Sequence, residues 1–139
     1  LHGDMNSFLI YSSYQASDDH SAKSVLVECV GLSLSQFGYP NDEGVAEHRL
    51  AGKGLANVEA LGEVKDSELL REYESIRRRS AERIWQGRGV SGSPSPKRHF
   101  IFLLKENVFE AVCRELRLVG VFPDHSAALR EAASRINLG

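Results

Sequence analysis

The sequence predicts an α+β fold, a mainly antiparallel, hairpin-connected β-sheet with one long and one short helix packed on a face. Most apolar segments alternate with a period of two, and only two segments have helical spacing. Short turns, rather than βαβ crossovers, join successive strands. The length of 139 residues suits one domain. We therefore expect residues 1–139 to form a single α+β domain.

The composition is that of an ordinary folded protein. Apolar residues make up 42% of the chain and charged residues 26%, which excludes the low hydrophobicity of a disordered chain. No apolar run approaches the roughly 20 residues that cross a bilayer, and no signal-peptide pattern is present, so we expect a cytoplasmic protein. Residues 1–4 precede the only methionine, Met5, and are expected to be a cloning remnant. Cys29 and Cys113 lack CxxC spacing and are predicted to be reduced, buried thiols.

The first strands are predicted from aromatic and β-branched residues. Residues 7–14, SFLIYSSY, form the expected first strand. In residues 24–37, SVLVECVGLSLSQF, the apolar positions alternate but change parity near Gly31. An unpaired residue in a β-bulge produces such a change, and glycine often marks one. We predict one long, bent strand with a bulge near Gly31.

The clearest helix is predicted over residues 65–87, after a short strand in 57–64. Asp66 or Ser67 is the expected N-terminal cap, and Gly87 is the expected end. One apolar stripe is expected to pack on the sheet; it comprises Leu69, Leu70, Tyr73, Ile76, Ile84 and Trp85. Residues 87–98, rich in glycine, serine and proline, are predicted to be a flexible loop.

The second half begins with HFIFLLK, residues 99–105, which is apolar on both faces. This pattern is typical of a central strand covered on each side or of a strand at a dimer interface. Residues 105–107 then turn the chain, and residues 108–116 return antiparallel with Glu110 on the face opposite Phe109. Residues 116–122 form a further strand or continue this one.

The last helix is predicted after Asp124 or Ser126, either of which is a good cap. Its expected apolar stripe comprises Leu129, Ala132, Ala133 and Ile136. The two predicted helices and the hairpin-connected strands together account for the predicted fold class.

Three segments resemble a group of small uncharacterised bacterial proteins. They are FGYPNDEG (37–44), EHRLAGKGL (47–55) and HFIFLLKENVFEAV (99–112). The chain departs from the group's pattern at Arg49, where a proline often follows the histidine, and at Lys105 with Glu106, where a His-Asp pair often forms the turn. The resemblance covers most of the chain and implies a shared fold, but no activity. The departure at the turn argues against a catalytic role for that hairpin.

The candidate site lies in residues 36–55 and on the sheet that they cross. Its glycines and polar side chains exceed what a turn requires, and an acid on a strand face would anchor a ligand in any cavity there. A bound ligand is expected to face the sheet. The candidate ligand-binding residues are Glu28, Tyr39, Asp42, Glu43, His48, Lys53 and Glu110.

Two other kinds of site have weaker patterns. Asp42, Glu43 and His48 have oxygen and imidazole groups for metal or acid–base chemistry, but no H-x-x-x-H spacing accompanies them, and a solvated helical turn also explains them. Lys53 lies in GKG, without the spacing of a phosphate loop. We therefore expect no metal or other cofactor and name no catalytic residue.

The charge distribution bears on partners. Residues 1–70 carry 11 acidic and 4 basic side chains, whereas residues 71–98 carry 8 basic and 3 acidic ones. Arg77, Arg78 and Arg79 would suit phosphate contacts, but glutamates interleave with the arginines and three consecutive residues diverge around a helix. The leading hypothesis is a non-enzymatic homodimer that binds a small molecule or protein. A small hydrolase-like enzyme using residues 42–48 and a nucleic-acid-associated protein are the alternatives.

Overall fold

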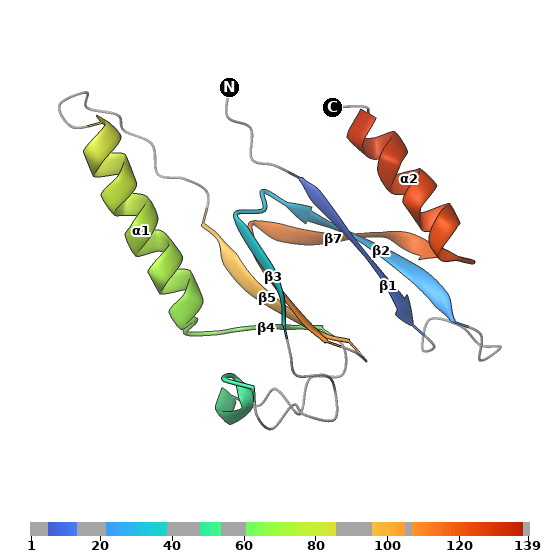
Figure 1. The fold of residues 1–139 in the computed structure, drawn as a ribbon, viewed down its shortest axis with the longest axis horizontal. Coiled ribbons are helices and arrows are strands. Elements are labelled where there is room, and N and C mark those ends of the chain that lie inside the picture. The colour runs from blue at the N-terminus through green and yellow to red at the C-terminus, as the bar shows by residue number, and fades with distance from the viewer. Residues whose placement is uncertain are drawn as a thin grey trace. The chain divides into compact units, whose positions relative to one another are not determined.

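The protein is described from a computed structural model, which defines residues 6–13, 22–38, 48–53, 61–85, 96–104 and 107–137. Within these ranges, seven strands form two antiparallel sheets and two α-helices accompany them, which confirms the α+β class (Figure 1). The chain divides into two compact units, residues 1–33 with 115–139, and residues 34–114. Neither described α-helix is long and apolar enough to cross a membrane.

The first unit is a three-stranded sheet with a helix on one face. Strands β1 (Ser7–Ser13), β2 (Lys23–Val30) and β7 (Glu115–Phe122) follow the order β1-β2-β7. Helix α2 (His125–Asn137) packs on this sheet, where Leu26 contacts Ala128 and Ala132. Oδ1 of Asp124 accepts the amide of Ala127 at 2.8 Å, so Asp124 is the cap of α2.

Of the four residues in the predicted stripe of α2, Ala132 is buried as predicted and the other three are exposed, so the predicted orientation of the helix is wrong. Ala128 and Ala132 are buried, whereas Leu129 is 53% exposed and Ile136 is 64% exposed. Alanine lets the helix approach the sheet closely, and the larger apolar side chains lie on the flank. The buried face is therefore rotated from the one that side-chain size predicts.

The predicted long strand through Gly31 is two strands in two sheets. Strand β2 ends at Val30, Gly31 adopts a φ of 66°, and β3 (Leu34–Gly38) belongs to the other sheet. Glycine adopts this left-handed conformation without steric cost. The parity change marks a chain crossing, and a register shift occurs instead at Leu26/Val27 against β7.

The second unit contains the four-stranded sheet β3-β6-β5-β4. Its other strands are β4 (Leu61–Glu63), β5 (Arg98–Leu103) and β6 (Val108–Cys113). Phe37, Phe109 and Phe102 line one face, with ring centroids 4.6 Å and 5.6 Å apart. The opposite face carries Ile101 and Val108, against which Leu50 packs. The segment 48–53, which ends in the 3₁₀ turn η2 (Ala51–Lys53), thus covers this face.

Strand β5 is a central strand. Of the two explanations offered for its apolar faces, a covered central strand and a dimer interface, the structure confirms the first. It lies between β4 and β6, and His99 through Phe102 are buried in the single chain. A dimer interface is therefore not needed to explain its apolar faces. Cys29 and Cys113 are buried and form no disulfide, as predicted.

Helix α1 (Glu68–Trp85) follows β4, and its cap is Ser67, whose Oγ accepts the amide of Leu70 at 2.9 Å. The prediction that its whole stripe packs on the sheet is wrong, because Ile76 is 56% exposed. The expected end at Gly87 lies outside the described residues. The predicted loop over 87–98 ends earlier than expected, since Lys97 is buried and Arg98 begins β5; residues 86–95 lie outside the described part.

Candidate functional site

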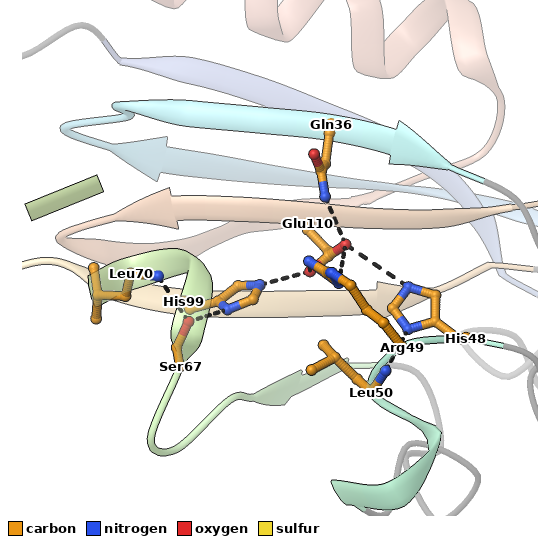
Figure 2. A network of polar contacts seen from close by, with 8 residues as sticks. All are labelled: Gln36, His48, Arg49, Leu50, Ser67, Leu70, His99 and Glu110. Carbon is orange, nitrogen blue, oxygen red and sulfur yellow. Dashed lines mark hydrogen bonds and ion pairs between the residues drawn. The ribbon is translucent and has the colours of Figure 1, made fainter. Parts of the chain in front are cut away.

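The second unit contains a buried carboxylate, Glu110, on the face of β6 that the segment 48–53 covers. Its side chain is 4% exposed. Figure 2 shows the carboxylate between His99, which extends from β5, and the side chains of Arg49 and His48. A buried charge is unfavourable unless other groups compensate it.

Four hydrogen bonds compensate the Glu110 charge. Arg49 donates from Nη2 to Oε1 at 2.6 Å and from Nη1 to Oε2 at 3.1 Å. Nε2 of Gln36 donates to Oε2 at 2.9 Å, and Nε2 of His99 lies 2.8 Å from Oε1. Burial acts to raise the pKa of Glu110, but the bonds from His99 and Gln36 and the charge of Arg49 outweigh it and hold this pKa below its ordinary value.

The ionised carboxylate determines the proton positions of His99. Because an ionised carboxylate only accepts, Nε2 of His99 must carry a proton. Nδ1 of His99 lies 2.7 Å from Oγ of Ser67, the cap of α1. In the neutral imidazole, the Ser67 hydroxyl donates to Nδ1. A continuous chain of hydrogen bonds therefore joins the start of α1 to β5 and β6.

The neighbouring His48 is held in its neutral form. The amide of Leu50 donates to Nδ1 of His48 at 3.0 Å, which a protonated Nδ1 could not accept. The proton is therefore on Nε2, which faces Oε2 of Glu110 at 3.8 Å. Burial, together with the charge of Arg49, lowers the pKa of His48, although Glu110 acts in the opposite direction.

The structure brings together two of the seven predicted site residues, His48 and Glu110. Glu28 lies on β2 in the first unit, where Oε1 accepts a hydrogen bond from Asn6 at 2.9 Å. Lys53 ends η2. The remaining three, Tyr39, Asp42 and Glu43, lie outside the described residues.

Sequence reasoning missed four members of the network: Gln36, Arg49, Ser67 and His99. One signal was available for His99, because a histidine in the otherwise apolar HFIFLL requires a buried partner. Arg49 adjoins a predicted residue, but its partner is 61 positions away.

Comparison with protein families, with curated proteins and with solved structures gives no match. The function is therefore argued from the chemistry of the site.

The chain Ser67–His99–Glu110 has the connectivity of a serine–histidine–acid relay. Ser67 is 5% exposed and His99 is 1% exposed, so the hydroxyl does not face solvent. The same oxygen also accepts the amide of Leu70 in capping α1. We interpret this chain as a structural connection. Among the described residues, no group of three or more histidine, cysteine or acidic side chains is arranged to hold a metal ion.

Proposed function

We propose that the protein is a non-enzymatic, cytoplasmic binding module that acts as a homodimer and binds a small molecule or protein along β3 and the segment 48–53. The observation that supports this proposal is the saturation of Glu110. Four hydrogen bonds occupy its two oxygens, so it has little capacity left for acid–base chemistry. Its effect is to fix Gln36 of β3 and Arg49 of the segment to one carboxylate.

The fixed elements leave groups suited to recognition at their surface. Phe37 is 60% exposed, while its ring contacts the buried ring of Phe109. Arg49, which binds Glu110 on the opposite face of the sheet from Phe37, is 47% exposed. Aromatic and arginine side chains are the commonest anchors of binding surfaces, and rigid placement lowers the entropic cost of binding.

The edge of β3 adds a second means of binding. Among the described strands, β3 pairs with β6 alone. An extended peptide could add to such an edge through main-chain hydrogen bonds, with Phe37 as a side-chain contact. A flat small molecule would instead use the aromatic ring.

A thermal-shift screen tests this proposal. Wild type, Phe37→Ser and the control Leu118→Ser are screened against small metabolites and short extended peptides; Leu118 is 68% exposed, on β7 of the other unit. We expect to find compounds that raise the Tm of wild type and of Leu118→Ser but do not change the Tm of Phe37→Ser. If no compound raises the Tm, or if Phe37→Ser responds like wild type, the proposed surface is wrong.

The enzyme alternative would use His48 with Asp42 and Glu43. Against it, Nδ1 of His48 accepts the amide of Leu50 and Nε2 carries a proton, so neither nitrogen is available as a general base. Two results would overturn the binding proposal in favour of an enzyme. The first is turnover of ester or phosphoester substrates that is lost in His48→Ala. The second is a metal that wild-type protein retains when purified without chelator and that His48→Ala does not retain.

The nucleic-acid alternative would use the arginines of α1. Arg78 and Arg79 are exposed, whereas Arg77 is partly buried. Retention on heparin at physiological salt, abolished by Arg78→Glu, would favour nucleic acid over the proposed ligand classes. Elution in the flow-through would count against it.

A further inference from the structure

We propose that α1 pairs with α1 of a second copy of the chain, in antiparallel orientation, through one charged stripe of the helix. The inference rests on the homodimer of the proposed function and names its surface. The stripe comprises Glu68, Glu72, Ile76, Arg79 and Arg83, which the spacing of 3.6 residues per turn places on one face.

The stripe is open to solvent. All five residues are exposed, and Ile76, the apolar residue in its middle, is 56% exposed. An open hollow of about 510 Å³ borders this face. It is lined by Glu68, Arg71, Glu72, Ser75, Ile76 and Arg79. A single exposed apolar residue is ordinary on a protein surface, so the case for a contact surface here rests on the charges that flank Ile76.

The order of charges makes the stripe complementary to the same stripe on a second helix that runs in the opposite direction. The two acids precede Ile76 and the two arginines follow it. When a second helix runs antiparallel with its centre opposite Ser75 and Ile76, Glu72 faces Arg79 of the second copy and Glu68 faces Arg83 of the second copy. A parallel pair would place like charges opposite one another, so the pattern favours one orientation.

Interactions within a single helix account for this order only in part. Glu68 and Arg79 each have an opposite charge three residues later, at Arg71 and Glu82, but Glu72 and Arg83 have none three or four residues away. Glu68 with Glu72, and Arg79 with Arg83, are like-charge pairs at a separation of four residues, which destabilise an isolated helix. The helix dipole favours an acid in the first turn and a base in the last, but its effect does not extend to Glu72 and Arg79. Helices of this length need tertiary or quaternary packing for stability. A second copy would add an opposite charge beside each of these like-charge pairs and so offset their repulsion.

Sedimentation equilibrium of charge-reversal variants tests this pairing. In a symmetric antiparallel pair, the Glu72–Arg79 contact occurs twice, so Glu72→Arg or Arg79→Glu each creates two repulsive contacts. We expect a wild-type dimer and a dissociation constant raised at least about tenfold in each single variant. The double variant, Glu72→Arg with Arg79→Glu, restores opposite charges and should dimerise like wild type.

The matched control is Glu74→Arg, which makes the same change of charge on the opposite side of α1, where Glu74 is also exposed. Far-UV circular dichroism verifies that each variant keeps its helix content. Raised salt should weaken the wild-type dimer, since the contacts are solvent-accessible.

The outcomes separate this surface from the dimer itself. A wild-type dimer that Glu72→Arg and Arg79→Glu leave unchanged would overturn the α1 surface but keep the homodimer. A wild-type protein that stays monomeric at about 100 µM, well above the micromolar constants of weak interfaces, would overturn both. Ligand-induced Tm shifts that depend on Phe37 would leave the binding function standing in either case.

Discussion

The guanidinium of Arg49 contacts the carboxylate of Glu110 through both terminal nitrogens, at 2.6 Å and 3.1 Å. The carboxylate is 4% exposed and the arginine side chain is 47% exposed. A bidentate pair of this kind is directional as well as charged. It therefore joins the segment 48–53 to β6 in one orientation.

Replacing Glu110 by glutamine should destabilise the protein by about 2 kcal/mol, because Arg49 and His99 lose their anionic acceptor inside the unit. The value is below the largest costs of broken buried pairs, since Arg49 is half exposed. Urea unfolding followed by circular dichroism measures the free energy of unfolding. The matched control is Glu131→Gln, which breaks the exposed pair with Arg135 and should cost less than about 0.5 kcal/mol. Equal costs at the two sites would contradict the structural role of Glu110.

Stability should fall as the pH falls below about 6.5. The pKa of His48 is lowered from its ordinary value of 6.5, so below that pH the unfolded chain binds a proton that the folded chain does not. The lowered pKa of Glu110 acts in the same direction below 4.5. The contributions of His48 and Glu110 to the free energy of unfolding are fully present above pH 6.5 and are lost progressively as the pH falls.

His48→Asn tests the first part of this pH dependence. The asparagine oxygen can still accept the amide of Leu50 but does not titrate, so the free energy of unfolding should vary less between about pH 7 and pH 5. His125→Asn, at the exposed start of α2, serves as the control. An unchanged pH profile in His48→Asn would show that His48 does not cause the loss.

Ser67→Ala should cost more than Asp124→Ala, although each removes a helix cap. An N-terminal cap contributes about 1 kcal/mol, and Ser67 also provides the hydrogen bond to Nδ1 of His99, which is buried. We expect about 2 kcal/mol for Ser67→Ala and about 1 kcal/mol for Asp124→Ala. Chemical denaturation measures both. Equal losses would indicate that the contact between Ser67 and His99 contributes nothing.

Gly31→Ala should destabilise the protein by about 1 kcal/mol, because a residue with a Cβ is strained at a φ of 66°. Gly52→Ala is the matched control, since a Cβ there meets no atom within 4 Å. We expect no loss, or a small gain, at Gly52. Thermal unfolding compares the two Tm values, and an equal response would exclude backbone strain at Gly31.

The class of fold followed from local patterns, but its division into two sheets did not. The alternation of Val25, Val27 and Cys29 predicts a strand, because every second side chain of a strand lies on the same face of the sheet. The parity change at Gly31 was also visible. A bulge and a crossing between sheets produce the same change, and only the pairing partners of β2 and β3 separate them.

The sequence predicted those members of the candidate site that can be recognised from a single residue and its neighbours in the chain. His48 and Glu110 were named because each has an ionisable group where turn or strand geometry does not require one. The bond between Ser67 and His99 joins residues 32 positions apart, and its formation depends on how α1 follows β4. Long-range contacts of this kind follow from the fold, so sequence patterns near either residue do not reveal them.

The interleaving of the two sheets along the chain affects the order in which they are completed during synthesis. Every described strand of the second unit, β3 to β6, leaves the ribosome before β7, whereas β2 must wait for β7 to pair along its second edge. The β1–β2 hairpin is thus synthesised first, but the sheet that contains it is completed last. An unpaired strand edge in a nascent chain is a site of misassociation. The first unit should therefore be the aggregation-prone part of a polypeptide whose translation stops before residue 115.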